Sequence, residues 1–172
     1  MSHSPPAPLV EGTEFRSMMA RFPSGVSVVT AYGPDGGPCG MTCTSLCSVT
    51  LKPPTLLVCL RNGSPTLEAV LSSGSFVVNL LHSGGRPAAE LFGSGRPDRF
   101  EAVRWTDSPT GAGPALGADV HAVADCRVSS AQRVGTHTVV YGEVLRLVLR
   151  PEDRPLLYGL RDYADWPTLL HT

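Results

Sequence analysis

Residues 26–49 have the sequence VSVVTAYGPDGGPCGMTCTSLCSV, and this stretch decides the fold class of the 172-residue chain. β-Branched side chains dominate residues 26–30, which is typical of a strand. The GPDGGP segment at residues 33–38 is rich in turn-forming residues. The pattern predicts a β-hairpin whose returning strand runs from Cys39 to Val49.

The rest of the chain combines further short strands with a few short helices. Apolar residues at helical spacing between Thr13 and Phe22 predict an amphipathic helix. Apolar runs bounded by turn-forming residues predict strands at 55–60, 76–81, 120–130, 137–150 and 156–158, and helical segments at 64–73 and 87–92. Six or seven strands with hairpin-type connections favour an antiparallel barrel over βαβ units, so the predicted class is mainly β. The loop-rich region 82–117 is of a length that usually carries a site or an interface.

Composition limits the function classes. The chain has 42% hydrophobic and 17% charged residues and a formal net charge of −1, which fits one globular domain over residues 13–172 behind a disordered tail over residues 1–12. A nearly neutral chain has no cationic field for a nucleic acid or an anionic membrane surface, so we expect neither as a partner. No segment resembles an export signal or a transmembrane span. We therefore expect a cytoplasmic protein.

The five cysteines are an odd number, and without an export signal we expect reduced thiols and no disulfides. Cys39, Cys43 and Cys47 are spaced CxxxCxxxC, whereas zinc and iron–sulfur sites use CxxC pairs. We expect no metal, and instead expect the three thiols to share one face of a strand.

Nucleotide-binding motifs are absent from the sequence, which has neither a complete GxGxxG nor a GxxxxGK[ST] motif. The segment GMTCTSLCSVTLKPP, residues 40–54, instead puts several hydroxyls near a strand end. Such a place can hold a heteroaromatic ring edge or a phosphate, although an ordinary edge strand has the same composition.

Three segments together resemble the short-chain flavin reductase family: FRSMMARFPSGVSVVTA at 15–31, GMTCTSLCSVTLKPP at 40–54 and GTHTVVYGEV at 135–144. The resemblance extends from Phe15 to about Tyr163. It implies an FMN-binding split β-barrel that serves as the reductase component of two-component flavin monooxygenases.

The resemblance also implies a set of site residues. Those implied to bind the flavin are Thr42, Cys43, Thr44 and Ser45 along the isoalloxazine, Ser48 and Val49 towards the ribityl chain and phosphate, Cys59, Leu60, Arg61, Ser64 and Thr66 at the phosphate end, and Arg99 and Phe100 in the middle loop. A plain helix N-cap is the alternative for Ser64, and a loop anchored in the core is the alternative for Arg99 and Phe100.

Gly135 and His137 are implied to bind the nicotinamide, with His137 as the catalytic residue. The family has Gly-Asp-His at this point, whereas this chain has Thr136 in place of the aspartate.

The activity implied by the resemblance is hydride transfer from NADH or NADPH to FAD or FMN. The free reduced flavin then goes to a partner flavin-dependent monooxygenase, and the reductase is a homodimer. Two other readings of the same site stay open: a split-barrel flavoprotein that retains its flavin and acts directly on an organic substrate, and a non-catalytic flavin-binding module.

Overall fold

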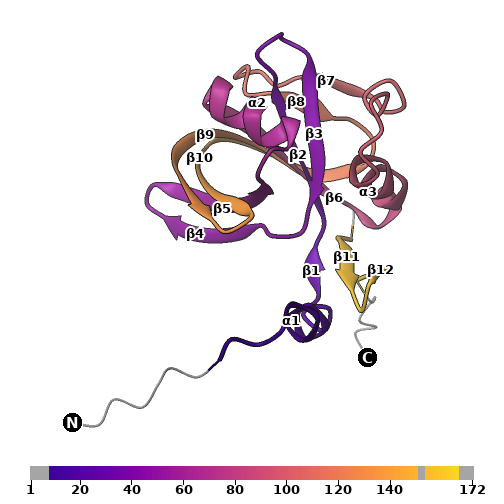
Figure 1. Cartoon of the computed structure of the whole chain (residues 1–172). Helices are drawn as coiled ribbons and strands as arrows, with labels where there is room; N and C mark the ends of the chain where they lie inside the picture. Colours follow the sequence, from indigo (N-terminus) through magenta and orange to yellow (C-terminus); the bar gives the residue numbers. More distant parts are fainter. Residues whose placement is uncertain (1–7, 151–153, 167–172) are drawn as a thin grey trace, which may run out of the picture.

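A computed structural model describes residues 8–150 and 154–166, and an antiparallel seven-stranded sheet forms its frame (Figure 1). The strands of this sheet lie in the order β3-β2-β6-β9-β10-β5-β4. Their bounds are β2 Ser27–Tyr32, β3 Pro38–Cys43, β4 Cys47–Leu51, β5 Pro54–Arg61, β6 Ser75–Leu81, β9 Val120–Val134 and β10 His137–Leu149. The predicted mainly β class is confirmed.

Strands β3 and β4 are consecutive in the chain but lie at opposite edges of this sheet, joined only by residues 44–46. The sheet must therefore curl until its two edges approach each other, and the result is a barrel with an open seam between the edge strands β3 and β4, at which the link over residues 44–46 also reaches β5. The prediction of one returning strand from Cys39 to Val49 is wrong. The chain leaves the β2 edge after Cys43 and pairs with β5 from Cys47 onwards.

Two smaller sheets and the helices complete the molecule. A three-stranded sheet contains β1 Ser24–Gly25, β11 Leu156–Gly159 and β12 Asp162–Asp165, and a two-stranded one contains β7 Trp105–Asp107 and β8 Pro114–Leu116. The helices are α1 Gly12–Met19, α2 Pro65–Ser73 and α3 Arg86–Gly93, with a 3-10 turn, η1, at Ser83–Gly85. No helix within the described residues is long and apolar enough to cross a membrane.

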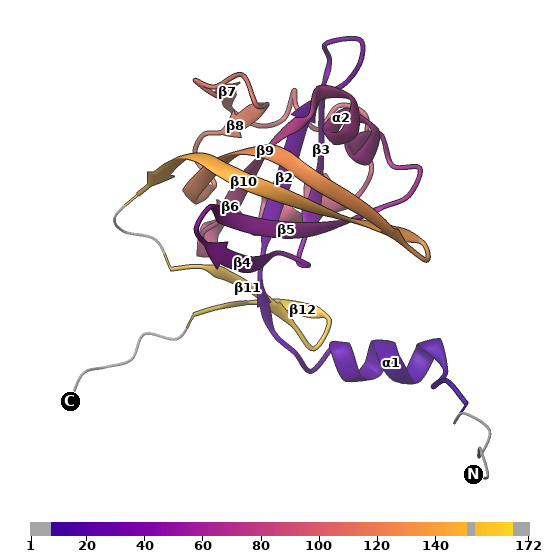
Figure 2. The same ribbon diagram turned by 90° about the vertical axis from the view of Figure 1, so that its left-hand side faces the viewer.

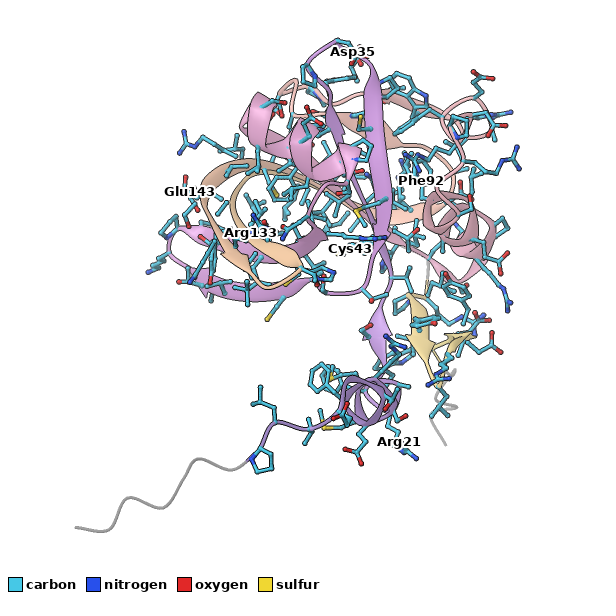
Figure 3. All side chains as sticks on the ribbon, in the orientation of Figure 1. Arg21, Asp35, Cys43, Phe92, Arg133 and Glu143 are labelled. Carbon is cyan, nitrogen blue, oxygen red and sulfur yellow. The ribbon has the colours of Figure 1, made fainter. Side chains whose placement is uncertain are left out.

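The core lies on both faces of β2 and β6, because alternate residues of these strands point in opposite directions. Val29 and Val78 pack inside the barrel with Val58, Leu60 and other buried residues. Val28 and Val77 pack on the other face against α3, β8 and β11. Figure 3 shows the same division at β3, with Cys43 on one side and Phe92 of α3 on the other.

Helix α1 differs from the others because it lies outside the barrel and buries none of its residues (Figures 1 and 2). The predicted helix over 13–22 is present, although it begins at Gly12 and ends at Met19. Its apolar residues Phe15, Met18 and Met19 remain exposed, as does Phe22 just after it. Of the predicted tail over residues 1–12, residues 1–7 lie outside the described part of the chain, and 8–11 are exposed.

Strands β9 and β10 form a long hairpin that curves across the barrel (Figure 2). The first strand of this hairpin, predicted at 120–130, is longer than predicted, because β9 continues to Val134 and a two-residue turn at Gly135 and Thr136 leads into β10. Gly135 has a φ of 55°, a left-handed conformation that glycine adopts readily. The short turn places His137 at the first position of β10.

Candidate functional site

The seam of the barrel is held by the hydroxyl of Ser45. Its Oγ donates a hydrogen bond to the Cys59 carbonyl at 3.0 Å and accepts one from the Cys59 N–H at 3.2 Å. The Cys43 thiol lies 3.2 Å from the same oxygen, and burial raises the pKa of this thiol above its ordinary value. The link over residues 44–46 is therefore attached to β5 by a side chain that replaces the missing strand pairing.

Two further residues of the predicted ring-binding segment also have structural partners. Thr42 donates a hydrogen bond to the Ala89 carbonyl at 2.6 Å and so ties β3 to α3. Cys43 is buried in the barrel core. Thr44 is exposed, and within residues 8–150 and 154–166 its hydroxyl has no hydrogen-bond partner. Thr44 and the backbone of the link are thus the groups that remain available to a ligand.

A pocket of about 590 Å³ opens beside this link. The link forms one wall, the end of α1 a second and the β11–β12 turn a third, and the lining residues are Arg16, Met19, Ala20, Phe22, Ser24, Thr44, Ser45, Leu46, Cys47, Tyr158, Gly159 and Arg161. The volume lies in the range typical of small-molecule sites. The sequence predicted a site at the link but not the other two walls, because no local signal brings α1 or the β11–β12 turn, which follows the link by more than a hundred residues, to this place.

Arg61 and His137 lie beside each other at the end of the β5–β10 pair, where they are direct register partners. Both side chains are exposed. The two residues were predicted separately, one at a phosphate site and one at a nicotinamide site, and the structure brings them together. Arg61 follows Cys59, whose backbone bonds to Ser45 of the pocket wall, by two residues, about 7 Å along the strand.

Asn62 holds the strand end and the hairpin turn together. Its backbone N–H donates to the Thr136 carbonyl at 3.0 Å, and its side-chain amide donates to the Gly135 carbonyl at 3.1 Å. Its side-chain oxygen accepts a hydrogen bond from Thr138 at 2.7 Å. These three bonds fix the position of His137 relative to Arg61.

His137 also contacts Thr136, the residue that stands where the resembling family has an aspartate. The Thr136 hydroxyl lies 3.0 Å from Nδ1 of the ring. The threonine therefore orients the imidazole by a hydrogen bond but brings no negative charge beside it.

Helix α2 begins next to this pair. Ser64 is its N-cap and accepts a hydrogen bond from the Leu67 N–H at 3.2 Å, as the capping alternative required. The predicted Thr66 and Leu60 are buried, so their side chains do not face the site. The start of α2 and the exposed Arg61 form a positively polarised corner that suits an anion.

The remaining predicted residues lie away from this surface or present little to it. Phe100 is only 9% exposed and packs edge-on between Phe92 and Trp105, with ring centroids 5.1 and 5.8 Å away, as the core-anchor alternative described. Arg99 is half-buried and close enough to Cys39 to lower the pKa of that thiol, although burial raises it more. Ser48 and Val49 are exposed on β4.

The cysteines do not share one strand face, so this prediction is wrong. Cys39 and Cys43 both contact the barrel core from β3, whereas Cys47 belongs to β4 and is exposed. All five cysteines are unpaired. Among the described residues, no group of three or more His, Cys, Asp or Glu side chains can hold a metal ion.

Known proteins resemble the chain over nearly its whole length. The profile of the family described as "Flavin reductase like domain" matches residues 19–167. A flavin reductase (NADPH) of Lentzea aerocolonigenes is 52% identical over 161 residues, 94% of each chain. A flavin reductase (NADH) of Kitasatospora aureofaciens is 47% identical over 92% of this chain and 84% of its own. Among solved structures, a homologue of nitrilotriacetate monooxygenase component B from Mycobacterium thermoresistibile superposes with a TM-score of 0.85, at 33% identity over 93% of this chain and 89% of its own.

Proposed function

The chain belongs to the flavin reductase-like family, and on that premise we propose that it releases its reduced flavin to a separate flavin-dependent monooxygenase. It is an NAD(P)H-dependent flavin reductase, with FAD or FMN and NADH or NADPH as its cofactors. A solved relative named as a monooxygenase component supports a partner of this kind.

The proposal rests on a ligand-sized pocket beside the link and on the exposed Arg61–His137 pair, which lies two residues along β5 from the Ser45–Cys59 bond. The pocket offers the exposed hydroxyl of Thr44 and the backbone of the link, which can hydrogen-bond the polar edge of a flavin. The exposed guanidinium of Arg61 suits its phosphate, and the N-terminal end of the α2 dipole lies beside it, although Pro65 has no N–H and the Leu67 N–H is already bonded to Ser64. These residues fit a flavin without a covalent or metal anchor.

The chemistry itself requires little from the side chains. When bound, the flavin supplies the hydride acceptor and the pyridine nucleotide supplies the donor. The residues of the link orient the flavin ring, and His137 positions the nicotinamide beside it by a hydrogen bond. Because the site is a surface rather than an enclosed cavity, the reduced flavin can leave.

A homodimer completes this proposal. Helix α1 leaves Phe15 and Met18 exposed outside the pocket, and the helix forms one wall of the pocket. Such an apolar face costs free energy in water, and a second copy of the chain that covers it stabilises both the helix and the site. We also place the protein in the cytoplasm, a location supported by its five unpaired cysteines.

Replacing Arg61 by Gln tests the flavin site. The dissociation constant of FMN should rise roughly tenfold, because a charge-assisted hydrogen bond to its phosphate is lost. Riboflavin lacks the phosphate, so its dissociation constant should stay the same. An equal loss for both flavins would contradict the placement of the phosphate at Arg61.

Release is tested with the wild-type protein and an unrelated monooxygenase that needs free reduced flavin, separated by a dialysis membrane. With NADH or NADPH and flavin on the reductase side, the oxygenase substrate should be converted across the membrane. If the flavin is reduced but stays with the protein and the oxygenase remains idle, the chain is a flavoprotein that retains its cofactor.

A further inference from the structure

Two arginines of the pocket, Arg16 on α1 and Arg161 after β11, carry no assigned role. We infer that Arg16 and Arg161 bind a phosphate group of the pyridine dinucleotide and so help to set the preference between NADPH and NADH. This inference rests on the proposed function and adds to it a second anion site, separate from the corner at Arg61.

Both guanidinium groups lack a counter-charge. Within residues 8–150 and 154–166, neither side chain forms a hydrogen bond or an ion pair. The acid next to Arg161 is Asp162, which lies 3.5 Å from Arg86, and Arg86 also pairs with Glu90 at 2.8 Å. Two like charges at one pocket without an acid favour a ligand that brings negative charge.

The fold holds the two arginines at the same pocket. Arg161 and the preceding Leu160 have φ values of 66° and 52°, a left-handed backbone that is unusual for such residues. The N–H of Leu160 donates to the Ala20 carbonyl at 2.6 Å, which attaches this turn to the end of α1. A residue keeps such an unfavourable backbone conformation only where its surroundings hold it there. Here the turn is held against the end of α1, so Arg161 stays beside the helix that carries Arg16.

The flavin edge is proposed to lie at the link, and the two other walls of the pocket, from α1 and the β11–β12 turn, suit the adenylate half of a dinucleotide. The apolar residues of these walls include Met19, Phe22 and Tyr158, which offer contact area to an adenine ring. The position proposed for the flavin phosphate, at Arg61 and the start of α2, does not line this pocket. NADH and NADPH both contain a pyrophosphate, and NADPH also carries a 2′-phosphate. Two different phosphate groups of the dinucleotide therefore suit the arginines.

The test is calorimetric binding of NAD⁺ and NADP⁺ to the full chain without flavin. The variants are Arg16→Gln, Arg161→Gln and the double variant. Arg21→Gln is the matched control. Arg21 lies just after α1, its side chain bonds to the Ser17 carbonyl, and it does not line this pocket. Each pocket variant should raise the dissociation constant of NADP⁺ about tenfold, as expected for a lost charge-assisted bond.

The two nucleotides separate the two sources of phosphate. A loss for NADP⁺ alone supports a contact with the 2′-phosphate, and an equal loss for NAD⁺ supports a contact with the pyrophosphate. Unchanged dissociation constants in the double variant, or an equal loss in Arg21→Gln, would overturn the inference. Wild-type protein that binds neither nucleotide and oxidises neither in the presence of flavin would instead refute the proposed function.

Discussion

The role proposed for His137 rests on its position at an exposed strand end. His137 is the register partner of Arg61, and its Nδ1 is oriented by the Thr136 hydroxyl at 3.0 Å. That leaves its second ring nitrogen for a ligand. A residue of this kind contributes one hydrogen bond to substrate binding, so its loss should weaken the site without destroying it.

Replacing His137 by Ala should raise KM for NADH or NADPH by roughly fivefold, because a hydrogen bond contributes about 1 kcal/mol. The dissociation constant of the oxidised flavin should change by less than about twofold, since the proposed flavin contacts are the link and Arg61. Steady-state kinetics and flavin titration measure the two quantities. If flavin affinity collapses while KM for the nucleotide stays the same, His137 belongs to the flavin site.

The cysteines should differ widely in reactivity. Cys47 is exposed beside the pocket, whereas Cys126 is fully buried and its pKa is raised to about 12 by burial and, second, by Asp125. A raised pKa lowers the fraction of reactive thiolate at neutral pH. In a titration with a thiol reagent, Cys47 should react first and Cys126 only on unfolding. Replacing Cys47 by Ser should abolish the fast phase, and loss of that phase in Cys126→Ser would contradict the assignment.

The packing of the barrel requires the backbone of β10 to lie close to side chains of the barrel core. Gly142 pairs with Val128 of β9 and Leu56 of β5, and a Cβ atom there would overlap the ring of Phe76 and lie 3.1 Å from Cβ of Cys126. Phe76 is fully buried and has no room to move. Glycine is required at this point because the aromatic ring fills the space of its side chain.

Replacing Gly142 by Ala should lower the free energy of unfolding by about 1–3 kcal/mol, as overpacking of a core does. Gly25→Ala is the control, because no atom lies within 4 Å of a Cβ at Gly25. Denaturant unfolding followed by circular dichroism compares the two variants. Equal stability of Gly142→Ala and the wild type would contradict the packing described for Phe76.

Local sequence patterns predicted most of the helices and strands. They did not predict how these elements pair and pack against one another. Strands such as β2, β5 and β6 follow from β-branched and apolar runs, and α2 follows from its N-cap and the glycine after it. The break after Cys43 was missed because no Gly or Pro interrupts residues 41–52, and its cause is a long-range crossing from one sheet edge to the other. The same applies to the site: Arg61 and His137 were found separately, and only the strand register joins them.

Helix α1 takes part both in the proposed dimer and in the pocket. Its apolar face has no partner within the described residues, and its end forms one wall of the pocket. Light scattering at micromolar concentration should therefore give about twice 18.2 kDa. Phe15→Asp, which changes an exposed residue outside the pocket, should shift the protein towards the monomer and lower its activity. A fully active monomer would refute the dimer.

We propose that this chain binds a flavin and a pyridine nucleotide at the same time and lets hydride pass between them. Rapid mixing of the protein with NADH or NADPH and oxidised flavin under anaerobic conditions tests it most directly. The visible absorbance of the oxidised flavin should disappear in proportion to the nucleotide consumed, with FMN or FAD, and only when the protein is present. Flavin that stays oxidised with both nucleotides would contradict the account.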